Sequence, residues 1–518
     1  MTGIVAARWD RRRLAGVVVA AVLVVAATIV EVARTGDAVE GLKAFGAAVI
    51  AVAVGWFATT LPGITLRGVL IGAVFVVAGI FTWTFTSRPI LIWAVLGLGG
   101  VLFAVWTFPW RAPGGRAQLR EWYDRLRTLP RVGTAWLGLA YWLLGIVGAV
   151  LVGHLGVAAQ RVAYAGVFTL AALAVLAAVR HRGGGADPSV GIAAAIIGGL
   201  ALLFLFGSGS LFDARHAVPD AFSARLMTSR FWGGDGLYYH PNSMAGLAVV
   251  AALRIGPDRA FALWQRWAAM LLAGFLMYLS DARTAFVFAV AAAAVHAVLL
   301  WRGRHTDLPT YRRRWVAALA PFAVVVLVLV LLGGRQFLFQ SRLSNNYDPT
   351  SGRLATWSQV WTDWRQAPVA EKLFGDARTS RAVVHRSNDG NGGRTELNTD
   401  DAFVGSFRRG GVLGALAFLV GLALLLWHAV LRRWGALFGR AGPGATPGAG
   451  LPAAWFTVAA LAAVPTIVTE DWMLGGTNGV LWILVLAGEA VVVLRTGRAG
   501  RAATEAATAP AESPPQAL

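Results

Sequence analysis

The sequence contains no cysteine, which excludes a disulfide framework, thiol catalysis and a cysteine-based metal site. It is also poor in charge, because charged residues make up 14% of the chain, whereas soluble domains usually carry about 25%. Hydrophobic residues make up 57%, and apolar runs long enough for a membrane helix of roughly 20 residues recur along the chain. These features predict an all-α, polytopic integral membrane protein with about fourteen transmembrane helices.

The net charge of +20 is the one feature that would suit a nucleic-acid-binding protein. The arginines, however, gather at the ends of apolar runs, mainly in the segments 109–134, 301–315, 432–440 and 495–501. Such clusters are typical of cytoplasmic loops or of contacts with anionic lipid headgroups. We therefore expect no nucleic-acid partner and a multi-pass protein of the bacterial cytoplasmic (inner) membrane. With an even number of spans, all four segments and both termini are cytoplasmic.

One long polar segment, residues 333–411, divides the chain. We expect membrane helices 1–11 in residues 1–332, an extracytoplasmic loop domain at 333–411, helices 12–14 in residues 412–495 and a disordered cytoplasmic tail at 496–518. The first apolar run lacks a clear small-residue cleavage site, so it is predicted to be a retained helix. A loop of this length is uncommon in a compact protein unless it has a function. Loop 333–411 is therefore predicted to cap an extracytoplasmic active site.

Within this loop, residues 354–366 have a helical pattern. Trp357, Val360, Trp361 and Trp364 recur at the spacing that puts them on one helix face. Trp prefers the membrane interface, so the helix is expected either to lie flat on the outer leaflet or to pack on the membrane domain.

A short polar turn, Ser280 to Arg283, separates two apolar runs. An arginine at membrane depth is costly and marks function by default, and its planar fork suits phosphate oxygens. The alternative interpretation is that Arg283 extends to the interface or pairs with Asp281.

A second motif, Tyr239-His240-Pro241-Asn242, opens an unusually short apolar run. Pro241 suits the first turn of a helix, and Asn242 could cap the helix or form a hydrogen bond there. An ordinary capped helix start is the alternative. The upstream Arg230 is expected to face the same outer side.

The loop contains three further motifs: Thr350-Ser351-Gly352-Arg353, Leu373-Phe374-Gly375, and Asn398-Thr399-Asp400-Asp401 followed by a glycine-rich re-entry into the membrane at 410–414. The two adjacent carboxylates of Asp400 and Asp401 could hold a metal, act as a general base, or pair with Arg408 and Arg409.

Taken in order, these motifs resemble those of the O-antigen ligase and polymerase superfamily of bacterial membrane glycosyltransferases, over roughly residues 239–425. The resemblance implies an enzyme that transfers a glycan from a polyprenyl-diphosphate carrier to a glycan or lipid acceptor on the outer face of the membrane. It also implies cell-surface polysaccharide assembly with inversion of the anomeric carbon, no cofactor and no metal. Polysaccharide assembly proteins are further candidate partners.

The resemblance also assigns candidate site residues. Arg283 and Arg353 fall where the family has arginines thought to hold the diphosphate. Asp400 falls where many ligases have His followed by Asn, and an acidic residue there is more similar to polymerase-type members. Asp400 is the expected catalytic base and Asp401 its rival. The remaining candidate substrate-binding residues are Arg230, His240, Asn242, Ser280 and Glu470, the last in the polar stretch 470–472.

Two other functions stay open. A polysaccharide or lipid transporter would suit the many helices, but transporters usually carry polar residues near the midplane, and here the polar residues lie at the outer edge. Other lipid-linked glycosyltransferases often carry an acidic metal-binding pair in their first outer loop. The corresponding loop, 31–43, is short and has no such pair.

Overall fold

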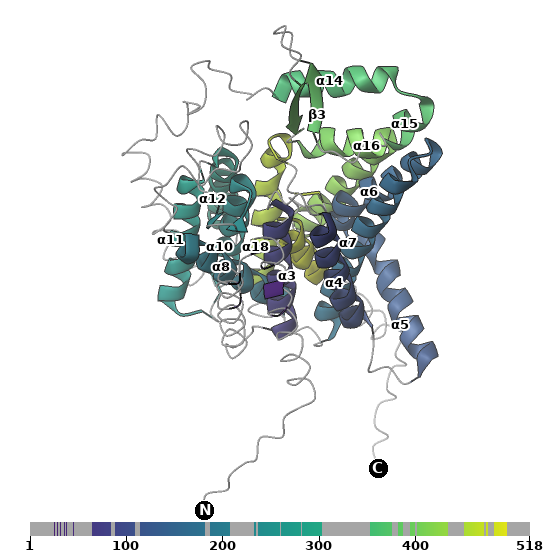
Figure 1. The fold of residues 1–518 in the computed structure, drawn as a ribbon. Coiled ribbons are helices and arrows are strands. Elements are labelled where there is room, and N and C mark those ends of the chain that lie inside the picture. Colours follow the sequence, from purple (N-terminus) through teal and green to yellow (C-terminus); the bar gives the residue numbers. More distant parts are fainter. Residues whose placement is uncertain are drawn as a thin grey trace, which may run out of the picture.

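The computed structural model describes a helical bundle with a smaller layer across one end (Figure 1). The described residues are 65–83, 89–108, 114–181, 187–207, 233–234, 237–258, 261–280, 282–302, 353–375, 382–386, 394–398, 401–433, 450–470, 473–474 and 481–494, with isolated residues before 65. The runs predicted to span near residues 14, 42 and 315 lie outside these ranges or are described only at isolated positions.

The first half of the bundle consists of α3 (Leu66–Trp83), α4 (Pro89–Thr107), α5 (Gly115–Thr128), η1 (Leu129–Arg131), α6 (Gly133–Leu151), α7 (Leu155–His181) and α8 (Pro188–Gly207). The second half consists of α10 (Pro241–Ile255), α11 (Leu263–Leu279), α12 (Arg283–Arg302), α16 (Ala402–Ala429), η3 (Leu431–Arg433), α18 (Gly450–Ala463), η4 (Val464–Val468) and a last helix, Leu481–Leu494.

Most of these helices are apolar around their whole circumference, which is typical of helices buried in a large core or in a bilayer. Large apolar side chains also face outward, for example Leu416, Leu419 and Trp427 on α16. Among the described residues, α6, α7 and α16 are long and apolar enough to cross a membrane, as judged by length and composition. The helical membrane architecture predicted from the sequence is thus confirmed in outline.

Glycines on α6 allow its neighbours to approach closely, as small residues do in membrane helix pairs. A β-carbon at Gly133 would lie 2.4 Å from the carbonyl oxygen of Gly421 on α16, and one at Gly421 would lie 2.9 Å from that of Gly133. Gly138 leaves room for the indole of Trp482, whose Nε1 donates to the Thr134 carbonyl at 2.6 Å. The α6–α16 crossing is therefore set by residues without side-chain bulk.

The fold departs from all-α in two antiparallel hairpins. One pairs β1 (Gly233–Gly234) with β2 (Leu237–Tyr238), and the other pairs β3 (Ala382–Arg386) with β4 (Arg394–Asn398). A local signal existed for the second hairpin, because an Asp-Gly pair and further glycines separate β3 from β4 in the sequence, and such residues favour hairpin turns.

The described parts of the loop segment lie together at one end of the bundle (Figure 1). They are α14 (Arg353–Gln366), α15 (Val369–Phe374), β3, β4 and the first part of α16. We call this end of the bundle the loop end. Helix α16 bends at Gly411, where φ is 63°, so its first part lies across the loop end and the remainder runs down into the bundle (Figure 1).

Candidate functional site

Glu470 is a carboxylate buried at the loop end, with 2% of its surface exposed. Helix α18 leads to it and gives way to the 3-10 helix η4, which has a proline in its first turn. Proline cannot donate to the α-helical hydrogen-bond ladder. The Thr469 N–H closes a tighter turn onto the Thr466 carbonyl at 3.1 Å, and the Glu470 N–H bonds to the same carbonyl at 2.9 Å. This end of α18 and η4 places the Glu470 side chain beside the start of α10.

Asn242 meets Glu470 from α10. The backbone of His240 caps this helix without a side-chain hydrogen bond, and Pro241 occupies its first turn. Asn242 therefore does not cap the helix, as one interpretation of the sequence suggested, but donates its side-chain amide to Oε1 of Glu470. The two residues are separated by 228 positions in the chain.

Arg353 reaches the same carboxylate from the loop. It is the first residue of α14, and its Nη2 lies 3.9 Å from Oε1 of Glu470. A buried carboxylate is costly unless hydrogen bonds and opposite charge compensate it, and Asn242 and Arg353 supply both. Three of the predicted site residues thus form one cluster that joins α10, η4 and the loop, which we call the Glu470 cluster.

Two hydroxyl groups that were not predicted as site residues adjoin this cluster. Tyr239 and Ser243 lie on either side of the His240–Asn242 segment, and both are fully buried. Neither hydroxyl has a hydrogen-bond partner among the residues that the structure describes. Burial raises the pKa of Tyr239, so its phenol keeps its proton. Tyr239 was visible in the sequence as the first residue of its motif, whereas no sequence signal distinguished Ser243.

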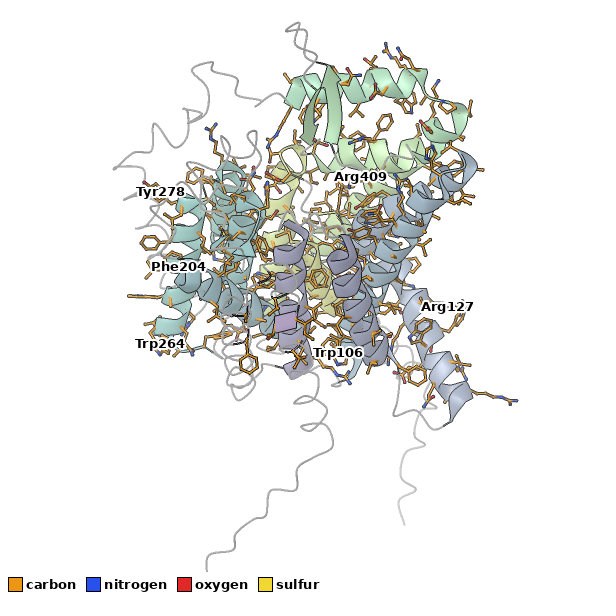
Figure 2. The ribbon with its side chains drawn as sticks, viewed as in Figure 1. Trp106, Arg127, Phe204, Trp264, Tyr278 and Arg409 are labelled. Carbon is orange, nitrogen blue, oxygen red and sulfur yellow. The ribbon has the colours of Figure 1, made fainter. Side chains whose placement is uncertain are left out.

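Arg283 and Ser280 lie at the turn between α11 and α12. Helix α11 runs from Trp264, at the end far from the loop, to Tyr278 near the loop end (Figure 2). Arg283 then opens α12, which packs against both α10 and η4. The Ser280 hydroxyl bonds back to the Leu276 and Met277 carbonyls of α11. The structure thus places Arg283 at the same end as the Glu470 cluster and gives Ser280 a role in ending α11.

Asp401 begins α16. One carboxylate oxygen accepts a hydrogen bond from the Val404 N–H at 2.5 Å, which makes Asp401 the N-cap of this helix. The arginines that were alternative partners of the acidic pair have other described contacts. Arg409 lies over the Tyr141 ring at 5.8 Å, and Arg408 lines a pocket beside α14. Asp400 and Arg230 lie outside the described residues, and so does Asp281, the predicted alternative partner of Arg283.

The aromatic face of α14 packs on the first part of α16. Val360 is buried, and the Trp361 and Trp364 rings lie 6.0 Å and 5.4 Å from the Phe407 ring. Helix α14 also lies across the bundle end rather than along its axis (Figure 1). Trp361 keeps 45% of its surface exposed. Val360 and Trp364 therefore pack toward a neighbouring helix of the same loop segment, whereas the sequence pattern had suggested the outer leaflet or the membrane domain.

The motif Leu373-Phe374-Gly375 contacts the bend of α16. A β-carbon at Gly375 would lie 2.1 Å from the Arg409 carbonyl, and one at Gly411 would lie 2.4 Å from the carbonyl carbon of Leu373. Both glycines have positive φ, which favours glycine over other residues. Two motifs from different parts of the loop thus form one backbone junction, which fixes the end of α15 against the re-entering helix.

The comparison with protein families bears on part of this site. Residues 268–394 match the O-antigen ligase family model. The resemblance predicted from the motifs is confirmed over this stretch, which includes Ser280, Arg283 and Arg353 but ends before Asp400. The O-antigen ligase match supports a membrane glycosyltransferase role in polysaccharide assembly, with a lipid-linked glycan donor and a glycan or lipid acceptor.

Other comparisons add little to the O-antigen ligase match. No curated protein matches the chain. One solved structure, the crystal structure of ArnT from Cupriavidus metallidurans in the apo state, shares 16% identity over 92% of this chain and 83% of that chain. The TM-score of 0.16 is too low for any argument about the fold.

Proposed function

We propose that this protein is an inverting, metal-independent glycosyltransferase of cell-surface polysaccharide assembly. It transfers a glycan from a polyprenyl-diphosphate carrier to a glycan or lipid acceptor at the outer face of the membrane. The acidic pair at Asp400 and Asp401, in place of the His-Asn of many ligases, favours a polymerase over a ligase.

The observation that carries this proposal is the Glu470 cluster. Asn242 and Glu470 come from the bundle and Arg353 comes from the loop, so the loop is tied to the bundle at the end where α12 presents Arg283. Arg283 and Arg353 both lie in the stretch that matches O-antigen ligases. A cationic site between a membrane bundle and a polar cap suits a substrate that has a lipid tail and a polar, anionic head.

The chemistry follows from the residue types. The leaving group is a lipid diphosphate, and Arg283 and Arg353 neutralise the charge that develops on it. Glu470 lies beside the Arg353 guanidinium group and orients it toward the diphosphate. Asp400 accepts the proton of the attacking acceptor hydroxyl. Attack on the anomeric carbon in a single displacement inverts its configuration. Arg230, His240 and Asn242 complete the substrate-binding surface, and Ser280 contributes by ending α11 just before Arg283.

The deciding experiment compares lipid-linked glycans in cells with and without the protein. Loss of the transferase should cause polyprenyl-diphosphate-linked glycans to accumulate on the outer leaflet, and purified protein should lengthen or transfer these glycans with release of polyprenyl diphosphate. Accumulation on the inner leaflet would instead indicate a transporter and would refute the proposal.

The proposal also requires about fourteen spans, cytoplasmic termini and an external loop at 333–411. Because the chain has no cysteine, a single cysteine introduced at Ser387 should react in intact cells with a thiol reagent that does not cross membranes. A cysteine introduced at Ser513, in the tail, should react only after lysis. The opposite pattern would invert the topology and rule out transfer at the outer face.

A further inference from the structure

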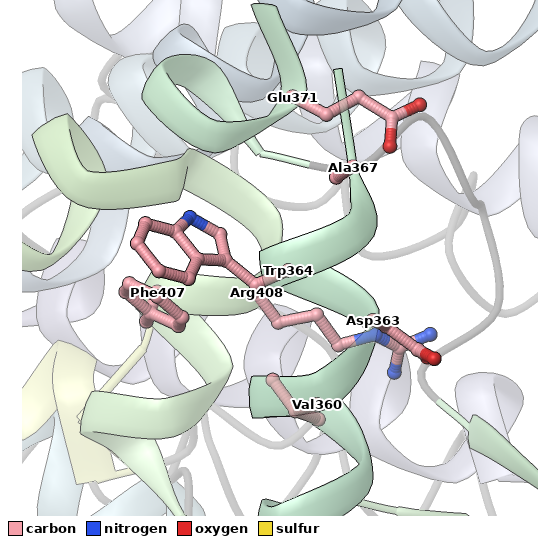
Figure 3. Close-up of a pocket in the computed structure, with 7 residues that line it drawn as sticks. All are labelled: Val360, Asp363, Trp364, Ala367, Glu371, Phe407 and Arg408. Atoms are coloured by element: carbon pink, nitrogen blue, oxygen red, sulfur yellow. The ribbon is translucent and has the colours of Figure 1, made fainter. Parts of the chain in front are cut away.

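A pocket lies between α14, the start of α15 and the first part of α16 (Figure 3). Helix α14 is the loop helix that begins with Arg353 of the Glu470 cluster. Its lining residues are Val360, Asp363, Trp364, Ala367, Glu371, Phe407 and Arg408. None of the functions assigned above to the candidate site uses this pocket.

One side of the pocket is aromatic and held in place. The Trp364 ring stacks on Trp361 at 4.9 Å and lies 5.4 Å from Phe407. Its Nε1 donates to the Lys372 carbonyl at 3.2 Å, which fixes the orientation of the indole. Aromatic rings that bury apolar area while keeping a defined orientation offer a flat surface for a ligand.

The other side is polar. Asp363 and Glu371 contribute carboxylates, and Arg408, with 7% of its surface exposed, contributes a guanidinium group. In Figure 3 the end of the Arg408 side chain points toward Asp363, and Glu371 lies apart from them, beside Ala367. Asp363 also accepts a hydrogen bond from the Gln359 amide at 2.7 Å. Asp363 is thus held by a neighbour on its own helix.

These groups select one class of ligand. Two carboxylates balance Arg408 and the Lys372 ammonium, which lies 5.9 Å from the centre of the Trp364 ring, so the pocket has no net positive charge to hold a phosphate or another anion. The charged groups also disfavour a lipid chain. A neutral sugar ring offers hydroxyl donors and acceptors to charged side chains, as well as C–H faces to aromatic rings. We propose that this pocket is a subsite for one uncharged sugar ring of the glycan.

The position of the pocket agrees with that assignment, which rests on the proposed function. Asp401 begins α16, and Phe407 and Arg408 follow on the same helix, about 10 Å further along its axis at 1.5 Å per residue. A sugar in the pocket would therefore lie a short distance from the reacting end of the glycan. Whether the sugar belongs to the donor or the acceptor is decided by the kinetics below.

The test uses the full-length protein in detergent and soluble oligosaccharides released by mild acid from the organism's own surface polysaccharide. Binding is measured by saturation-transfer NMR and titration for three variants: Glu371→Gln, Asp363→Asn and Trp364→Ala. Each should weaken the Kd by about tenfold or more, as expected for the loss of a charge-assisted hydrogen bond or an aromatic contact. Thr362→Ala is the matched control, because Thr362 is exposed on α14 and bonds only to its own helix at the Ser358 carbonyl in the described contacts.

The outcomes separate this proposal from the proposed function. A raised KM for the acceptor alone places the sugar on the acceptor, and a raised KM for the lipid-linked donor alone places it on the donor. Binding without any transfer by the wild type would refute the function and leave the subsite standing. Unchanged affinity in Glu371→Gln and Asp363→Asn, or no binding by the wild type at millimolar oligosaccharide, would refute the subsite even if transfer proceeds.

Discussion

The two ends of the bundle each bury a glutamate, and the glutamates are held in different ways. Glu489, fully buried, accepts hydrogen bonds from the Gly133 N–H at 2.8 Å and from the Thr134 N–H at 2.7 Å, and it contacts Nδ1 of His428 at 2.6 Å. All of these partners belong to bundle helices. Glu470 is held by Asn242 from the bundle and by Arg353 from the loop.

This difference agrees with a structural role for Glu489 and with the role in the substrate site that is proposed for Glu470. Glu489 satisfies the first N–H groups of α6, which have no partner within their own helix, and its negative charge is favourable at a helix N-terminus. Glu489 therefore links its own helix, Leu481–Leu494, to α6 and α16. Glu470 instead connects the bundle to the polar loop layer, and its cationic partner, Arg353, is one of the two arginines proposed to hold the diphosphate.

Arg254 shows the same contrast for positive charge. At the end of α10 far from the Glu470 cluster, its guanidinium group bonds to Asp187 at 3.1 Å, to Asp258 at 2.8 Å and to the Ser189 hydroxyl at 2.8 Å. These partners engage all three guanidinium nitrogens, so Arg254 holds α8 to α10. Arginines at the loop end, Arg283 and Arg353, are the ones proposed to bind substrate.

The largest expected effect is at Arg283. Arg283→Ala should abolish transfer, because no other group at that turn would neutralise the diphosphate. Arg283→Lys should be strongly impaired, since Lys keeps the charge but loses the bidentate fork. Transfer by purified protein and protein levels in the membrane are the measurements. Arg302→Ala, at the other end of α12, should remain active. A fully active Arg283→Ala would mean that Arg283 only extends to the membrane interface.

The next effect is at the acidic pair before α16. Asp400→Asn keeps size and hydrogen bonding but removes the base, so transfer should fall by about 10²–10⁴ while donor binding persists. Asp401→Asn should be nearly neutral, because Asn is also a good N-cap. Asp401→Ala should lose about 1 kcal/mol of helix stability. Normal transfer by Asp400→Asn together with loss in Asp401→Asn would exchange the two roles.

The two buried glutamates give the third test. Glu489→Gln should lower the free energy of unfolding in detergent by about 3 kcal/mol, because the NH2 group of the new side chain would face backbone N–H donors at the start of α6. Activity per folded molecule should persist. Glu470→Gln should leave stability nearly unchanged but reduce transfer by about 10²-fold or less, the expected cost of a slightly misplaced catalytic arrangement. A loss of stability in Glu470→Gln together with a loss of transfer in Glu489→Gln would contradict the roles assigned to the two glutamates.

The sequence predicted much of this arrangement because its signals are local. The helical pattern of the Trp-faced segment predicted α14, and the apolar runs and motifs placed Arg283, Asn242, Arg353 and Glu470 at one end. Periodicity reports which residues avoid water, but it does not report their partners. Sequence reasoning therefore did not find the pairing of Glu489 with His428, or Arg161 within α7, buried and bonded to the Gly145 carbonyl.

The contacts between motifs were likewise beyond sequence reasoning. The junction of Gly375 with Gly411 depends on two backbone segments approaching each other with no room for a β-carbon. The sequence shows both glycines but not their closeness. The same holds for the Glu470 cluster, whose members are far apart in the chain and meet only because α10 and α14 begin, and η4 ends, at one place.

The smallest expected effect is that of removing divalent metal ions, which should leave transfer unchanged. At the loop end, Glu470 is compensated by an amide and a guanidinium group rather than by further carboxylates, and the described residues contain no group of three His, Asp or Glu that could hold a metal ion. Transfer by purified protein should therefore continue at its normal rate in EDTA. A chelator-sensitive enzyme that magnesium or manganese restores would make Asp400 and Asp401 metal ligands. In that case Asp400→Asn would lose activity through its metal affinity, and excess metal would rescue the variant, which a missing general base does not allow.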